Sequence, residues 1–355
     1  PFRRFVAVAL PLARPAIVGG AVLVCMEALN DYGAVKHYGA MTLTTGIFRS
    51  WGGLYDQGSA MRLATVLLVL VASLLITERI LRRKGLRSAD HRPMKRTTVS
   101  GAVRASVVVC CSLLFFFSSA LPIGVLIRDT IAVADVEQLS DLGIATLNTL
   151  HVGAWAAGVT LLIALMLAWS ERFAKRSVAR SSWLARLGYV VPGAIIAVGV
   201  MGLAGGIDKQ LVNMGITGRL LLIGTLPLLV YAFSVRFLAV AAQPINAGLE
   251  QQSRALDEAA RTLGASPLRT FFNVNLPLLR PALIAAVLLI VLEVMKELPL
   301  TLIMRPFDFD TLSTSVHRYT RIEQVREAAL PALAIVLCAL VPVLALDRLH
   351  GRPRQ

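Results

Sequence analysis

Eight apolar stretches, each close to 20 residues long, recur along the chain and limit the folds that it can adopt. A helix of about 20 residues is as long as the hydrocarbon core of a bilayer is thick. Segments that alternate apolar and polar residues are absent, which disfavours a transmembrane barrel. We predict an all-α, polytopic helical membrane protein with spans near 16–35, 63–81, 105–127, 147–169, 187–206, 219–240, 282–304 and 329–347.

The composition agrees with a membrane protein. Hydrophobic residues make up 56% of the 355 residues and charged residues 16%, whereas a soluble domain carries about a quarter charged residues. The net charge of +15 could indicate nucleic-acid binding. However, 23 of the 36 Lys and Arg residues lie in one alternate set of inter-span segments and ten in the other. This asymmetry follows the positive-inside rule, so we expect no nucleic-acid partner and place the C-terminus in the cytoplasm.

No motif for a cofactor, a metal or nucleotide hydrolysis occurs in the sequence. The four cysteines lie in apolar runs without CxxC spacing or a histidine cluster, so we predict neither a metal site nor a cofactor. The P-loop pattern GxxxxGK[ST] is missing, and we find no nucleophile–base pair. We therefore predict that the chain is not an enzyme.

A repeat relates residues 1–31 to residues 267–297, with twelve identical positions. A shift of three then aligns Thr42-Leu43-Thr44-Thr45 with Thr311-Leu312-Ser313-Thr314, and Arg49 with Arg318. Six predicted spans separate the copies, and an even number leaves both copies facing the same way. The repeat is thus expected to be parallel rather than inverted.

The repeat also divides the chain. We predict three parts: the remainder of a first half over 1–81, a basic cytoplasmic linker over 82–104, and a complete second half over 105–355. Because the chain starts at Pro1, inside the repeated segment and without an initiator Met, we expect it to be the C-terminal part of a longer protein.

The segment 241–281 between two spans carries clear helix signals. Ser253 to Thr262 favours a short helix, and Gly264 follows where a helix end prefers positive φ. Ser266 and Pro267 then stand at the N-cap and first position of a second helix. We predict helix, sharp turn and second helix, with the second running into the next span.

The pattern Glu258-Ala259-Ala260, Gly264 and Val274-x-Leu276-Pro277 closely resembles the EAA loop of ABC-importer permeases. Only Val274 departs, standing where that family usually has Ile. The resemblance implies the type I ABC importer permease fold in a bacterial inner membrane, with a loop that couples to a separate ATP-binding subunit. By position, the coupling residues are Glu258, Ala259, Ala260, Arg261, Leu263 and Gly264.

The resemblance also implies partners and a substrate class. The partners would be an ATP-binding ABC subunit in two copies, a periplasmic solute-binding protein and the lipid bilayer. The sequences around 27–33, 42–51 and 312–316 look most like permeases for ferric iron. Related fused permeases carry thiamine, phosphonates or other small solutes, and an ion-coupled secondary transporter is a further alternative.

Four carboxylates fall inside predicted spans, as two i, i+4 pairs that the repeat superimposes: Glu27 with Asp31, and Glu293 with Glu297. Ionisable groups at membrane depth normally face a bundle interior or a water-filled cavity. They either line a central translocation pathway or anchor helices by pairing with Lys296 or with arginines of other spans. The sequence leaves both roles open.

Overall fold

The computed structural model describes residues 3, 6–7, 10–83, 101–133, 135–173, 186–189, 191–216 and 221–350. Across these ranges the regular structure is helical and includes no strand, which confirms the all-α prediction. Most of the predicted linker, residues 84–100, lies outside the described residues, as do six of the first nine positions. The division into 1–81, 82–104 and 105–355 therefore stays a prediction.

Among the described residues before 174 there are three long helices, a broken pair and several short pieces. Its elements are α2 (Leu10–Asn30), α3 (Gly33–His37), α4 (Leu43–Phe48), η2 (Arg49–Gly53), α5 (Gln57–Arg83), α6 (Gly101–Phe115), η3 (Phe116–Ala120), α7 (Leu121–Val133) and α8 (Val136–Phe173).

The later part alternates long helices with short ones. Its elements are η4 (Arg186–Tyr189), α10 (Gly193–Asn213), α11 (Leu226–Glu250), α12 (Arg254–Thr262), α13 (Pro267–Thr270), η5 (Phe271–Asn275), α14 (Leu276–Leu278), α15 (Arg280–Lys296), α16 (Pro299–Met304), α17 (Leu312–Arg321) and α18 (Ala329–His350).

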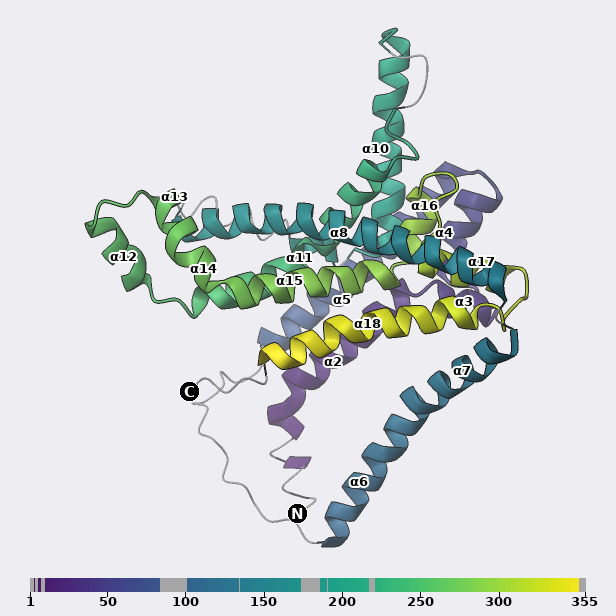
Figure 1. Ribbon diagram of the computed structural model, residues 1–355, viewed down its shortest axis with the longest axis horizontal. Helices are drawn as coiled ribbons and strands as arrows, with labels where there is room; N and C mark the ends of the chain where they lie inside the picture. Colours follow the sequence, from purple (N-terminus) through teal and green to yellow (C-terminus); the bar gives the residue numbers. More distant parts are fainter. Residues whose placement is uncertain are drawn as a thin grey trace.

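The centre of the molecule is a three-helix core of α8, α11 and α15, which run side by side (Figure 1). The helix α8 brings buried alanines to this core, among them Ala156 and Ala164, and small side chains let helices approach closely. Phe233 and Phe237 of α11 and Ile290 of α15 fill the space between them.

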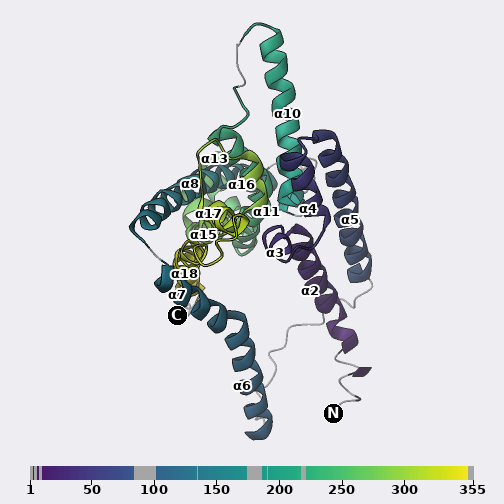
Figure 2. The ribbon, with the colours of Figure 1, turned by 90° about the vertical axis from the view of Figure 1, so that its right-hand side faces the viewer.

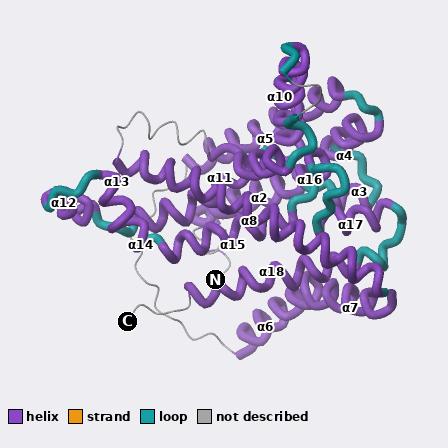
Figure 3. Tube along the Cα trace, turned by 45° about the horizontal axis from the view of Figure 1, so that its top comes forward, coloured by secondary structure: helices purple, strands orange, loops and turns teal. Residues whose placement is uncertain are grey.

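The short helices gather at the two ends of this core. The helices α12, α13 and α14 lie at one end, and α3, α4, α16 and α17 lie at the other (Figure 1). Loops concentrate at the same two ends (Figure 3). Two long segments, α10 and α6, project away from the core in opposite directions (Figure 2). The pair α6 and α7 has no buried residue.

Every predicted span overlaps a helix, yet the count of eight remains a prediction. Within the described ranges, five helices are long and apolar enough to cross a membrane, and a bent pair over 267–296 would make a sixth. The apolar segments Ala16–Asn30 and Ala329–Ala345 are shorter.

The two copies of the repeat share their local structure. Thr42 and Thr311 each begin a helix with a capping box, in which Thr45 and Thr314 respectively return a hydrogen bond to the capping residue. The alignment with the three-residue shift therefore pairs positions that fold alike.

Candidate functional site

The loop between α11 and α15 folds as two short helical segments separated by a turn at Gly264. The Ser253 hydroxyl accepts a hydrogen bond from the second N–H of α12 and caps that helix. Gly264 has a φ of +83°, and its N–H donates to the Arg261 carbonyl. Ser266 caps the second segment by accepting from the Arg269 N–H. The predicted helix, turn and second helix are confirmed.

The second segment does not run straight into the following span, which corrects the sequence-based expectation. Residues 267–278 meet α15 at a bend of 74°. Leu279 at the bend is buried and lies so close to Gly248 of α11 that a Cβ there would meet it at 2.8 Å. Packing of Leu279 on a glycine thus sets the loop at an angle to the core.

The surface of this loop is available to a partner. Of the six predicted coupling residues, Ala260 is half-buried and the other five are exposed, with Leu263 at 88%. Three further large apolar side chains are exposed beside them: Leu256, Leu268 and Phe272. Exposed apolar residues gathered on one projection are typical of a protein-binding surface.

A buried polar network holds α12 against the core, and the sequence analysis missed it. The Arg172 guanidinium, at the end of α8, donates to Asp257 Oδ2 at 2.7 Å and to the Leu249 carbonyl at 2.7 Å. Asn275 Nδ2 donates to Asp257 Oδ1 at 3.0 Å and to Gln252 Oε1 at 2.9 Å. Arg172 and Asp257 are 85 residues apart, so no local pattern could have paired them.

At the far end of α2 and α15, a cavity of about 650 Å³ brings the four predicted carboxylates together. Glu27, Asp31, Glu293 and Glu297 all line it, along with Arg236 and Lys296. We refer to it as the acidic cavity, because four acidic side chains face two basic ones. Neither of the two predicted roles is excluded by this placement.

Two of these carboxylates are ion-paired. Glu297 is 5% exposed and pairs with Arg236 of α11 at 3.1 Å, while its Oε1 accepts from the Leu300 N–H. Glu293 pairs with Lys296 at 3.1 Å, as the sequence suggested. Among the described residues, Glu27 and Asp31 form no ion pair. Glu297 therefore anchors α15 to α11, and the unpaired charge of the cavity comes mostly from Glu27 and Asp31.

A second cavity, of about 840 Å³, adjoins the first and is lined by the other sign of charge. Lys36, Arg49 and Arg321 line it with a single carboxylate, Glu323. We refer to it as the basic cavity.

The two cavities share Tyr32 and Gly33. Tyr32 is buried, stacks on Phe48 at 3.9 Å between ring centroids, and lies 5.5 Å from the His317 ring. His317 occupies the position that the repeat aligns with Phe48. The Tyr32 ring therefore contacts equivalent positions of the two copies and borders both cavities.

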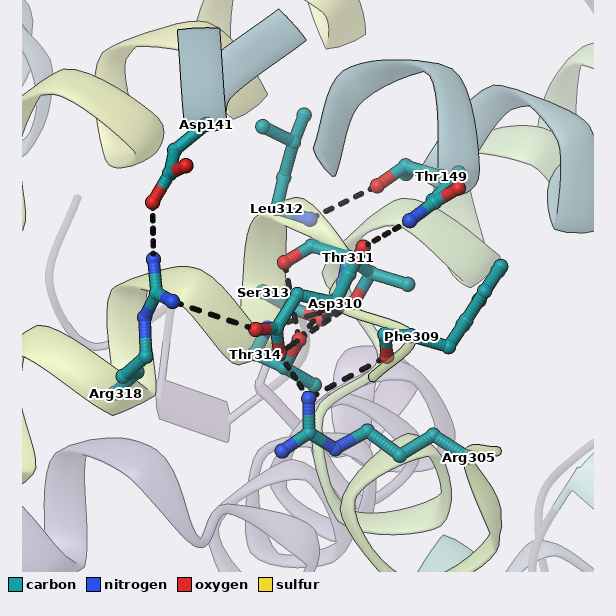
Figure 4. Close-up of polar contacts among 11 residues, drawn as sticks. Asp141, Thr149, Arg305, Phe309, Asp310, Thr311, Leu312, Ser313, Thr314 and Arg318 are labelled. Atoms are coloured by element: carbon teal, nitrogen blue, oxygen red, sulfur yellow. Dashed lines mark hydrogen bonds and ion pairs between the residues drawn. The ribbon is translucent and has the colours of Figure 1, made fainter. Parts of the chain in front are cut away.

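A polar network surrounds the start of α17, beside the basic cavity (Figure 4). Asp310 pairs with Arg305 and, at 3.6 Å, with Arg318, whose other terminal nitrogen donates to Asp141 at 3.1 Å. Burial disfavours the charged form of Arg318, but the bond to Asp141 and the charge of Asp310 outweigh it and raise its pKa. The Thr149 hydroxyl accepts from the Leu312 N–H at 2.8 Å. The network fastens α17 to α8.

In the described part of the chain, no three His, Cys, Asp or Glu side chains lie close enough to hold a metal ion.

Comparisons with known proteins give relatives of two kinds. The chain is 28% identical over 350 residues to "Fe(3+)-transport system permease protein FbpB 2" of Haemophilus influenzae, covering 95% of this chain and 66% of that relative. It is 27% identical over 266 residues to "Putative 2-aminoethylphosphonate transport system permease protein PhnV" of Salmonella paratyphi A, covering 71% of this chain and 97% of that one. A second Haemophilus influenzae relative, "Putative ferric transport system permease protein FbpB 1", is 25% identical, and the chain spans 47% of its length.

The fold is also similar to a solved structure. A chain of a bacterial alginate ABC transporter, solved in complex with an alginate-bound periplasmic protein, superposes with a TM-score of 0.58 at 14% identity. The match covers 71% of this chain and 94% of that one. The family described as binding-protein-dependent transport system inner membrane component matches residues 106–352. The chain therefore belongs to the family of inner membrane components of binding-protein-dependent transport systems.

Proposed function

We propose that this chain is the permease subunit of an ATP-driven importer and that α12 with Gly264 receives the motion of a separate ATP-binding subunit. One observation carries the proposal. The exposed α12 surface is fixed to the core by buried Arg172 and Asp257, so a force on it reaches the long helices. A loop without such a network would yield instead of transmitting the force.

The proposed mechanism is alternating access. Two ATP-binding subunits close on ATP, and each grips one loop: the loop of α12 and its counterpart in the first half. Closure would open the path toward a periplasmic binding protein that releases its substrate, and hydrolysis would reset the path toward the cytoplasm. This places α12 and the C-terminus in the cytoplasm and α17 on the outer side.

The substrate that we propose is ferric iron. The names of the Haemophilus influenzae relatives and the carboxylates of the acidic cavity support it. Phosphonate is the second candidate, since the Salmonella relative is named for 2-aminoethylphosphonate and is covered almost completely.

Cysteine cross-linking tests the coupling surface. We introduce Glu258→Cys in a background without the four native cysteines. When the assembled complex is treated with a short bifunctional cross-linker that reacts with this thiol, residue 258 should be cross-linked to the ATP-binding subunit. Glu323→Cys is the matched control, because Glu323 is an exposed glutamate at the opposite end of the core. Capture of the ATP-binding subunit at residue 323 but not at 258 would refute the placement of the loop.

Uptake measurements test the substrate. Proteoliposomes that hold the assembled importer and its binding protein should accumulate labelled iron on ATP addition and leave 2-aminoethylphosphonate outside. The reverse preference would replace iron by phosphonate and keep the permease proposal. Uptake that survives ATP removal but requires a proton gradient would contradict the ATP-driven mechanism itself.

A further inference from the structure

Equivalent arginines in the two copies of the repeat differ in their ion pairing. In the second copy, Asp310 directly precedes the capping residue Thr311 and pairs with Arg318. In the first copy, Met41 directly precedes Thr42, and Arg49 stands at the position of Arg318. The first copy thus has Met41 at the position where the second copy has Asp310, the carboxylate that pairs with Arg318.

The missing carboxylate leaves positive charge in the basic cavity. Arg49 forms no ion pair among the described residues, and the same holds for Lys36 and Arg321, which also line this cavity. Arg305 and Arg318, by contrast, both pair with Asp310, and Arg318 also pairs with Asp141 (Figure 4). The three unpaired cations come from two different copies of the repeat and face one space, in which Glu323 is the single carboxylate among the described lining residues.

The pKa of His317 also reflects the positive charge around the basic cavity. His317, on the wall of the basic cavity, has its pKa lowered by burial and then by the positive charges of Arg321, Lys36 and Arg305. Unpaired cations around one cavity attract an anion, and guanidinium groups match the oxygens of phosphate-like groups in geometry. A volume of about 840 Å³ is ample for a small molecule.

We propose that the basic cavity binds a phosphate-like tetrahedral oxyanion, held by Arg49, Arg321 and Lys36, as the anion that accompanies the iron in the transported cargo. The cavity lies beyond Tyr32 from the acidic cavity, so the cargo's anionic part is met first on the outer side and any cationic part is met afterwards. This proposal rests on the proposed function and extends it to the chemistry of the cargo.

Binding of inorganic phosphate to the purified chain in nanodiscs of neutral phosphatidylcholine tests the proposal. We expect saturable binding by calorimetry, weakened about tenfold or more by Arg49→Gln and further by adding Arg321→Gln, because hydrogen bonds to charged groups contribute at this level. Lys209→Gln is the matched control, since Lys209 is an exposed cation on α10 outside the cavity.

A second variant gives the first copy of the repeat the carboxylate that the second copy has at Asp310. Met41→Asp restores the carboxylate of the second copy, so it should neutralise Arg49 and abolish phosphate binding, whereas Met41→Asn should leave binding unchanged. Met41 is exposed, so neither change disturbs the core, and thermal unfolding of each variant verifies folding.

Three results would overturn the proposal. The first is the absence of saturable phosphate binding to wild type at millimolar concentration. The second is a phosphate affinity of the Arg49 and Arg321 variants equal to that of wild type, and the third is the same equality for Met41→Asp. A further arm adds phosphatidylglycerol to the nanodiscs: if this lipid displaces phosphate from the cavity, the site binds lipid headgroups and the cargo assignment is wrong. No ATP-binding subunit is present in these measurements, so their failure leaves the cross-linking result at Glu258 untouched.

Discussion

The turn after α12 depends on one backbone angle, the φ of Gly264. Its φ of +83° lies where residues with a side chain are strained, while nothing lies within 4 Å of the position a Cβ would take. Any effect of substitution there must come from the backbone rather than from a steric clash.

We therefore expect Gly264→Val to strain the turn by roughly 1–2 kcal/mol and to uncouple ATP hydrolysis from uptake. Gly264→Asn should keep more coupling than Val, because Asn tolerates positive φ better. The measurement is the ratio of substrate imported to ATP hydrolysed in proteoliposomes. Equal ratios for wild type and Gly264→Val would show that this angle is unimportant.

His317 provides a prediction on pH. Its pKa is lowered in the folded chain, so protons bind more readily to the unfolded chain. Its contribution to stability is complete above its ordinary pKa of about 6.5 and is lost as the pH falls below that value. Thermal unfolding between pH 8 and 5 should show a smaller loss of stability for His317→Gln than for wild type. His37→Gln, at an exposed histidine, should follow wild type.

The sequence predicted the helix caps and the turn, which depend on adjacent residues, but it did not identify ion pairs between residues far apart in the chain. Ser253, Gly264 and Ser266 were placed correctly because caps and turns depend on a few adjacent residues. The partner of Asp257 was not predicted, because Arg172 comes from another helix and only the packed fold brings it near. For Glu297, an arginine of another span was one of the two alternatives, and the packed fold identifies it as Arg236.

Among the elements, α12 owes its position to charges rather than to an apolar face. Asp257, its buried residue, points to Arg172 and Asn275. The bend of 74° before α15 was also beyond prediction, since it depends on Leu279 meeting Gly248 in another helix.

Removing Arg172 should free this helix. Arg172→Ala leaves the Asp257 carboxylate buried without its partner, and breaking a buried pair from one side costs about 3–5 kcal/mol. We expect a lower unfolding temperature and faster proteolysis between residues 250 and 275. Arg254→Ala, at an exposed arginine of the same helix, is the control and should change neither. Unchanged protease sensitivity in Arg172→Ala would mean that other contacts hold α12.

For the whole molecule, Tyr32 borders two cavities of opposite charge, and we predict that it is the barrier between them. Ala28 lines the acidic cavity, so a cysteine there reports on access through the barrier. In vesicles of outward orientation, Ala28→Cys should react slowly with an impermeant thiol reagent and faster once Tyr32→Ala is added. Tyr32→Phe keeps the ring and should react slowly. Equal rates in all three would place the barrier elsewhere.

The helix α8 runs unbroken for 38 residues and is fastened at both ends. In its first half the Thr149 hydroxyl accepts a hydrogen bond from the Leu312 N–H of α17, and near its C-terminal end Arg172 pairs with Asp257 of α12. At 1.5 Å per residue these two attachments are about 35 Å apart. Under the proposed coupling, α8 would carry a pull on α12 directly to α17, without passing through any loop.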